Sequence, residues 1–130
     1  MAELGVADAL GDGPRTATEL ATSVGAHPDA LHRVLRLLSA NGVFELRGGQ
    51  VSHTPASRLL QADHPQSLKS FALMFGLPIN WSPYLDFRHT VQTGQPASSK
   101  TLPGGYFSYF ERDPAAARIF NAAMAAKSQG

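Results

Sequence analysis

Hydrophobic residues recur at helical spacing most clearly between residues 28 and 40, PDALHRVLRLLSA. Apolar side chains stand at positions i, i+3, i+4 and i+7, which places them along one face of an α-helix. These apolar positions are Leu31, Val34, Leu35 and Leu38, with Leu37 beside them, and the face of Leu31, Leu35 and Leu38 is expected to be core. The opposite, polar face comprises His32, Arg33 and Arg36. The pattern predicts an amphipathic helix that ends at the Asn41-Gly42 pair.

Two shorter helices are predicted before this one. Residues 3–10, ELGVADAL, have an apolar face and are followed by two glycines and Pro14, which end a helix. A second helix is predicted from Thr18, whose side chain can cap its amino end, to Gly25, a residue typical of helix ends. A tight turn at residues 26–29 joins the second and third helices, as in a helix-turn-helix unit.

The hydrophobic period becomes alternating after residue 42. Residues 43–46 and 50–53 predict two short strands, and the glycines at 48 and 49 predict a hairpin turn between them. Thr54 and Pro55 then predict the start of a short helix that ends at Gln61. We therefore expect residues 1–62 to form a winged helix-turn-helix domain with a small β-hairpin wing.

Residues 63–130 predict a helical extension, so the expected fold class is mainly α. Helices are expected at residues 64–76, 82–93 and 115–127, the last capped by Asp113. Residues 77–80 are expected to be a connector, and residues 95–105, QPASSKTLPGG, a surface loop. No glycine-rich strand-to-helix turn occurs, so the sequence predicts no nucleotide-binding α/β domain.

Composition narrows the possible functions. The chain has 130 residues, with 11 Lys and Arg against 10 Asp and Glu. Nucleic-acid-binding domains usually have a strong basic excess, so we expect no nucleic-acid partner. The absence of cysteine excludes disulfides and thiolate metal ligands, and the histidine spacing fits no metal site. Without a bilayer-length apolar run or a signal segment, we expect no membrane partner and a cytoplasmic location.

Candidate catalytic groups are isolated along the chain. The sequence has no G-x-S-x-G motif, and its acidic residues are scattered singly. His53 in the wing and His89 in a helix could each act as a base, but a solvated surface histidine is the commoner use of such residues. We therefore predict no catalytic, cofactor-binding or metal-binding residue in this chain.

Aromatic residues gather in the last third of the chain, beyond the leucine-rich domain. They are Trp81, Tyr84, Phe87, Tyr106, Phe107, Tyr109, Phe110 and Phe120. So many large rings require a second core, a subunit interface or a small-molecule pocket. Packing in a core or between subunits is the commoner use of such rings, whereas the lining of an apolar small-molecule pocket is the more specific hypothesis.

The order of motifs resembles the amino-terminal domain of S-adenosylmethionine-dependent O-methyltransferases, the family of the plant caffeate-type and the bacterial polyketide and antibiotic enzymes. The motifs are GVADAL at residues 5–10, TATELA at 16–21, LHRVLRLLSANGVF at 31–44, HTPASRLL at 53–60 and FNAAM at 120–124. The resemblance covers essentially the whole chain. Each motif alone is unspecific, whereas their full order is fairly specific.

The resemblance implies that the winged helix serves for dimerisation. It implies a homodimer, S-adenosylmethionine as the cofactor of the full-length protein, and a small aromatic or polyketide-like acceptor. It also implies that the extension walls the acceptor pocket, and the residues expected there are Trp81, Phe107, Phe120, Asn121 and Met124. The family's cofactor motif and catalytic histidine have no counterpart here. We therefore expect a fragment that binds no S-adenosylmethionine and is inactive alone.

Two alternatives stay open at this level. The first is a winged-helix DNA-binding transcription regulator with an aromatic ligand-binding tail, in which Arg33 and Arg36 would enter the major groove. Its wing would add only Arg47, which Glu45 balances. The second is a non-catalytic adaptor that uses the fold for protein–protein contact. Sequence-selective gel shifts at low salt, abolished by Arg33→Ala with Arg36→Ala, would favour the regulator.

Overall fold

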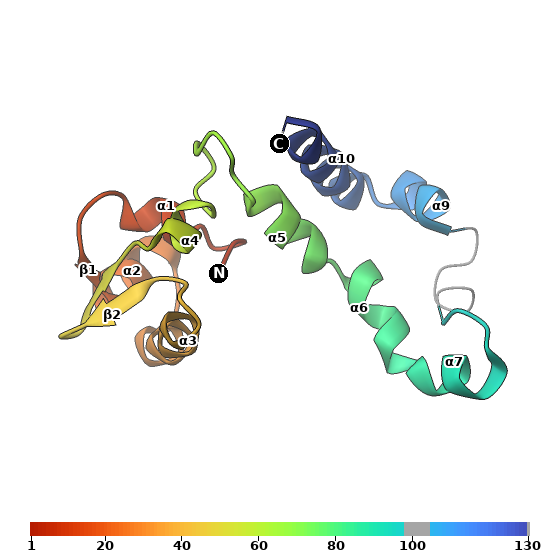
Figure 1. The fold of residues 1–130 in the computed structure, drawn as a ribbon, viewed down its shortest axis with the longest axis horizontal. Helices are drawn as coiled ribbons and strands as arrows, with labels where there is room; N and C mark the ends of the chain where they lie inside the picture. The colour runs from red at the N-terminus through yellow and green to blue at the C-terminus, as the bar shows by residue number, and fades with distance from the viewer. Residues whose placement is uncertain (98–104, 130) are drawn as a thin grey trace. The chain divides into compact units, whose positions relative to one another are not determined.

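The chain forms two compact units, Met1–Lys69 and Ser70–Gly130, in a computed structural model that describes residues 1–97 and 105–129 (Figure 1). Both units are mainly helical, as predicted, and a small antiparallel sheet lies in the first. The predicted loop at residues 95–105 falls largely outside the described residues.

The first unit begins with three helices and a short strand. These elements are α1 (Val6–Leu10), β1 (Arg15–Thr16), α2 (Ala17–Val24) and α3 (Pro28–Ala40), and α3 has the predicted bounds. The predicted cap of α2 is wrong: Thr16, and not Thr18, accepts the hydrogen bond from the Glu19 amide, at 3.1 Å. The Glu19 carboxylate in turn accepts from the Thr16 amide, at 3.2 Å. This reciprocal capping box requires Glu three residues after the cap, and only Thr16 has one.

The wing is a three-stranded sheet instead of a hairpin alone. Strands β2 (Glu45–Arg47) and β3 (Gln50–Ser52) pair antiparallel, with Leu46 opposite Val51. The glycines between them have φ angles of 58° and 79°, as a two-residue hairpin turn requires. Strand β1 pairs with the other edge of β3, so the order is β1-β3-β2. The sequence did not predict β1 because two residues are too few to show alternation.

The core of the first unit gathers side chains from all these elements. It includes Val6, Leu10, Leu20, Leu31, Leu35, Phe44 and Val51, each 4% exposed or less. Leu31 and Leu35 are buried as predicted, and Leu38 is partly buried against the same core. Val34, an apolar residue of the same helix, is 42% exposed. Leu37 beside it is 65% exposed. Helix α3 packs on α2 and β2, which cover a narrower arc than its apolar residues occupy.

The helix α4 (Pro55–Arg58) begins at Pro55 and is capped by Thr54, as predicted, but it ends before Gln61. The later helices are α5 (Lys69–Phe75), α6 (Pro78–Leu85), α7 (Phe87–Thr93), α9 (Gly105–Arg112) and α10 (Pro114–Gln129). Helix α5 starts later than predicted, because residues 64–68 form turns. The predicted connector at 77–80 is the start of α6, since Pro78 at the first helical position needs no hydrogen-bond partner. The single helix predicted at residues 82–93 is in fact divided between α6 and α7, which meet at Asp86.

Candidate functional site

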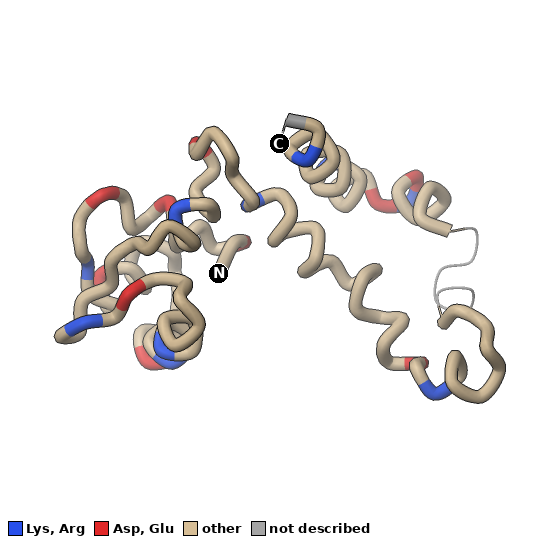
Figure 2. The backbone as a smooth tube through the Cα atoms, viewed as in Figure 1, with Lys and Arg blue, Asp and Glu red and all other residues tan. Residues whose placement is uncertain are grey.

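Helices α6 and α7 of the second unit expose large apolar side chains. Residues 70–85 contain no Asp, Glu, Lys or Arg, and Figure 2 accordingly shows this stretch uncharged. The apolar residues are Trp81, Tyr84, Leu85, Phe87 and Val91, each between 59% and 88% exposed. The ring centroids of Trp81 and Tyr84 lie 6.0 Å apart. Exposed apolar surface of this extent is typical of a face that contacts a partner or a ligand.

An aromatic cluster joins α9 to α10. The rings of Phe110 and Phe120 lie 4.8 Å apart, and Tyr106 and Tyr109 each lie within 6.1 Å of Phe110. The Tyr109 hydroxyl donates to Asp113 Oδ2 at 3.3 Å, and Asp113 Oδ1 accepts from the Ala116 amide at 3.1 Å. Asp113 therefore caps α10, as predicted, while it also holds α9. Burial raises the pKa of Tyr109, and the neighbouring Asp113 carboxylate adds to this rise.

The five predicted wall residues differ in their surroundings. Trp81 and Phe107 are 61% and 83% exposed, and Asn121 is also exposed. Phe120 and Met124 are half-buried, and Phe120 packs against Phe110. Within the described residues, no ring contact joins Trp81, Phe107 and Phe120 to one another. The geometry instead links the helices that carry them through residues of the aromatic run at 106–110.

One linking residue was not predicted from the sequence. Asn80 is half-buried at the start of α6 and accepts a hydrogen bond from the Tyr106 hydroxyl, at 3.3 Å. Its amide nitrogen donates to the carbonyl oxygen of Met74, at 2.6 Å. No sequence signal marks a single asparagine in a predicted connector for such a contact, because the two partners come from distant parts of the chain.

The first unit has its own outward apolar residues. Val34 and Leu37 are exposed on α3, on the part of the helix that α2 and the sheet leave uncovered, and Arg33 and Arg36 of the same helix are exposed as well. Lys and Arg positions of this unit are interspersed with Asp and Glu positions, as Figure 2 shows. This mixture differs from the continuous basic stripe typical of a nucleic-acid-binding face. The absence of a nucleic-acid partner stays a prediction.

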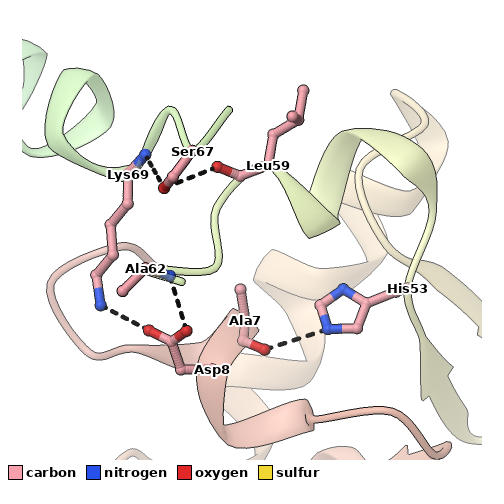
Figure 3. Close-up of polar contacts among 7 residues, drawn as sticks. All are labelled: Ala7, Asp8, His53, Leu59, Ala62, Ser67 and Lys69. Atoms are coloured by element: carbon pink, nitrogen blue, oxygen red, sulfur yellow. Dashed lines mark hydrogen bonds and ion pairs between the residues drawn. The ribbon is translucent and has the colours of Figure 1, made fainter. Parts of the chain in front are cut away.

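Polar contacts tie α1 to the end of the first unit (Figure 3). The Asp8 carboxylate accepts from Lys69 Nζ at 2.8 Å and from the Ala62 amide at 2.9 Å. The hydrogen bond from Lys69 holds the pKa of Asp8 below its usual value, although partial burial opposes this. The Ser67 hydroxyl accepts from the Lys69 amide and donates to the Leu59 carbonyl. These bonds fix the segment that leads out of the winged helix.

His53 is not the solvated surface histidine that the sequence favoured. Its ring is half-buried, with Nε2 3.2 Å from the Ala7 carbonyl oxygen and Nδ1 2.8 Å from Ser57 Oγ (Figure 3 shows the Ala7 contact). Ser57 is fully buried, so its hydroxyl is not exposed at the surface. Burial lowers the pKa of His53. His53 therefore has a structural role, because its hydrogen bonds connect α1 with the segment that follows the wing.

Two further features of the described residues bear on function. They contain no group of three or more His, Cys, Asp and Glu residues that could hold a metal ion. None of their helices is both long enough and apolar enough to cross a bilayer. The cytoplasmic location stays a prediction.

Comparison with known families decides what the first unit is. The family profile described as the O-methyltransferase dimerisation domain matches residues 1–63, the range that holds the three helices and the wing. Residues 1–63 are an O-methyltransferase dimerisation domain. The resemblance inferred from the motif order is thereby confirmed.

Similarity to individual O-methyltransferases continues beyond the dimerisation domain into the second unit. Phenazine O-methyltransferase PhzM of Lysobacter antibioticus is 39% identical over 125 residues, which is 95% of this chain and 36% of the relative. The crystal structure of LaPhzM is 38% identical, with a TM-score of 0.87, and the match covers 98% of this chain and 38% of that one.

A third match has bound ligands. The crystal structure of NcsB1, an O-methyltransferase from neocarzinostatin biosynthesis, contains S-adenosylmethionine and 2-hydroxy-5-methyl naphthoic acid. It is 32% identical, with a TM-score of 0.73, and the match covers 97% of this chain and 39% of NcsB1. This chain thus spans less than two-fifths of the length of each of the three proteins.

Proposed function

We propose that this chain supplies the subunit interface and one wall of the acceptor site of an S-adenosylmethionine-dependent methyltransferase that modifies a small aromatic molecule. The observation that carries this proposal is the order of its two units. A dimerisation domain is followed by uncharged or aromatic helices whose rings, Trp81 and Phe107 above all, are exposed. Exposed rings of this kind have a use when they meet a second apolar surface.

The proposed interface lies in the winged-helix domain, residues 1–62, and joins two copies of the chain as a homodimer. Val34 and Leu37 on α3 support this choice, because they are apolar and exposed although the core lies on the same helix. Burial of both side chains in a dimer would remove apolar surface from water, which favours association. The extension, residues 63–130, carries the proposed acceptor wall.

The proposed acceptor is a planar aromatic molecule. The wall consists of Trp81, Phe107, Phe120, Asn121 and Met124. Flat rings and a methionine favour a flat, apolar ligand by stacking and by sulfur–ring contacts, and an amide can fix its orientation by a hydrogen bond. The names of similar proteins, a phenazine methyltransferase and a naphthoic-acid complex, point to the same class of acceptor.

The described residues do not fit a binding site for S-adenosylmethionine. Their strands are the three short antiparallel strands of the wing, and none leads through a glycine-rich turn into a helix. A nucleotide-type cofactor is usually held at such a turn in a parallel sheet. We therefore propose that the cofactor is held by residues other than these. Calorimetric titration of this chain with S-adenosylmethionine should show no binding, and micromolar binding would contradict the proposal.

Sedimentation velocity over a range of chain concentrations tests the homodimer. We expect a dimer at tens of micromolar, and a folded monomer for Val34→Glu with Leu37→Glu, because two buried charges without partners would disfavour association. Arg36→Glu is the matched control, since it changes charge on the same helix outside the apolar pair. A well-folded monomer of the unaltered chain at these concentrations would refute the proposed interface.

A further inference from the structure

The side chain of Asn80 has a defined orientation that its partners dictate. Its Nδ2 atom donates to the Met74 carbonyl oxygen at 2.6 Å, and its Oδ1 atom accepts from the Tyr106 hydroxyl at 3.3 Å. A backbone carbonyl can only accept a hydrogen bond, so the NH₂ group must face Met74. The amide oxygen is thereby left for Tyr106, whose hydroxyl must donate.

This hydrogen bond is the start of a continuous series of contacts across three helices. Asn80 lies on α6 and Tyr106 on α9. The Tyr106 ring lies 6.1 Å from Phe110, which lies 4.8 Å from Phe120 on α10. All five residues of the proposed acceptor wall belong to these three helices. Trp81 directly follows Asn80, and Phe107 directly follows Tyr106.

We propose that Asn80 is a positioning residue for the acceptor wall: by holding the Tyr106 hydroxyl, it keeps α9 in place against α6 and presents Trp81 and Phe107 as one surface. The inference rests on the proposed function, because it takes these rings as the wall. Two exposed rings bind a flat ligand well only if they are ordered beforehand, since ordering them during binding would reduce the affinity. A hydrogen bond between the residues that directly precede the two rings in the sequence supplies that order.

Three variants of the whole chain and one control isolate this bond. Tyr106→Phe removes the donor and keeps the ring. Asn80→Ala removes the acceptor and also the Asn80–Met74 hydrogen bond, and the double variant combines the two changes. Tyr84→Phe is the control for the exchange measurement alone, because Tyr84 also lies on α6 and is 69% exposed. Within the described residues, its hydroxyl makes no hydrogen bond. Circular dichroism confirms that each variant is folded.

Hydrogen–deuterium exchange of the α9 backbone amides gives the first readout, which does not depend on any ligand. We expect exchange to be roughly threefold to tenfold faster in Tyr106→Phe and in Asn80→Ala, the factor that an ordinary net hydrogen bond corresponds to. The double variant should match Asn80→Ala, since both lose the Tyr106 bond and the Met74 bond. Unchanged α9 exchange in Tyr106→Phe, or effects that add in the double variant, would overturn the inference.

Binding of 2-hydroxy-5-methyl naphthoic acid gives the second readout, followed by the fluorescence of Trp81, the single tryptophan of the chain. We expect the affinity to fall severalfold in Tyr106→Phe and in Asn80→Ala. Faster α9 exchange with unchanged affinity would overturn the positioning role while the bond itself stands. If the unaltered chain does not bind the naphthoic acid, the proposed wall is contradicted, and so is the positioning role of Asn80. The exchange data would still show whether the Asn80–Tyr106 hydrogen bond forms.

Discussion

The Nε2 atom of His53 lies 3.2 Å from the carbonyl oxygen of Ala7, a residue 46 positions earlier in the chain. Because a carbonyl only accepts, Nε2 must carry a hydrogen, while Nδ1 lies 2.8 Å from the Ser57 hydroxyl oxygen, which also lies 3.1 Å from the Thr54 carbonyl oxygen. The ring also stacks on Phe44, with centroids 5.8 Å apart. His53 therefore joins α1 to the end of the wing and supports a buried phenylalanine.

This contact makes the stability of the dimerisation domain depend on pH. Burial, and then the nearby Arg58, lower the pKa of His53 below its ordinary 6.5, while the Ala7 carbonyl and the Asp12 and Asp8 carboxylates oppose the shift. The unfolded chain then binds the proton more readily than the folded chain. The free energy of unfolding should therefore keep the whole contribution of His53 above pH 6.5 and should decrease as the pH drops below that value. Urea unfolding at a series of pH values measures this.

His53→Gln is the control for the pH dependence, because glutamine does not titrate and can still hydrogen-bond. We expect this variant to lose the part of the pH dependence that begins near pH 6.5. An equal slope in the variant and the unaltered chain would mean that another group is responsible. Titration of the His53 ring by nuclear magnetic resonance should independently give a pKa below the ordinary value.

The capping box of α2 predicts opposite results for two nearby threonines. Thr16→Ala removes the acceptor of the Glu19 amide and should lower the free energy of unfolding by about 1 kcal/mol, the usual effect of losing a helix cap. Thr18 is the second residue of the same helix, where alanine is the better helix former, so Thr18→Ala should be neutral or slightly stabilising. Thermal unfolding of both variants measures the difference. A larger loss from Thr18→Ala would contradict the observed cap.

Local chemistry explains which parts of the fold could be predicted from the sequence. The bounds of α3, the turn at Gly48 and Gly49 and the Asp113 cap follow from spacing and from residue types that act within a few positions. The motif order also indicated the family. These features need no knowledge of distant parts of the chain.

Features that depend on distant partners could not be predicted in this way. Strand β1 exists because residues 15 and 16 pair with residues 50 and 51. His53 is half-buried because Ala7 and Phe44 lie against it, and Val34 is 42% exposed because no element among the described residues covers that part of α3. Asn80 gains its role from Tyr106, 26 residues later. Tertiary contacts decided each of these cases, and local patterns do not contain them.

The Asp8–Lys69 ion pair predicts a graded response to substitution. Asp8→Asn keeps an acceptor for the Ala62 amide but loses the charge opposite Lys69, and should cost about 0.5 kcal/mol because the pair is partly exposed. Asp8→Ala loses both bonds and should cost about 1–2 kcal/mol. The effect of Asp8→Asn should shrink in high salt, which screens the pair. Urea unfolding at two ionic strengths checks this, and a cost of Asp8→Asn independent of salt would argue against the ion pair.

Phe44 combines a buried side chain with a backbone conformation that suits glycine. It is 1% exposed, and its φ angle of 65° lies in the left-handed region, where a Cβ atom is unfavourable. Phe44→Ala should cost about 3–5 kcal/mol by emptying the core, and it retains the backbone strain. Phe44→Gly empties the core almost as much but relieves that strain.

The difference in stability between Phe44→Ala and Phe44→Gly measures the cost of the left-handed backbone conformation at residue 44. Glycine is normally less stable than alanine by about 0.5–1 kcal/mol within regular structure. At residue 44 we expect the reverse, with Phe44→Gly more stable than Phe44→Ala by about 1 kcal/mol, because a non-glycine residue in this conformation costs about that much. Ala7→Gly in α1 is the control and should show the ordinary loss. The same order at both positions would mean that Phe44 is held without strain and that its ring alone explains its place in the core.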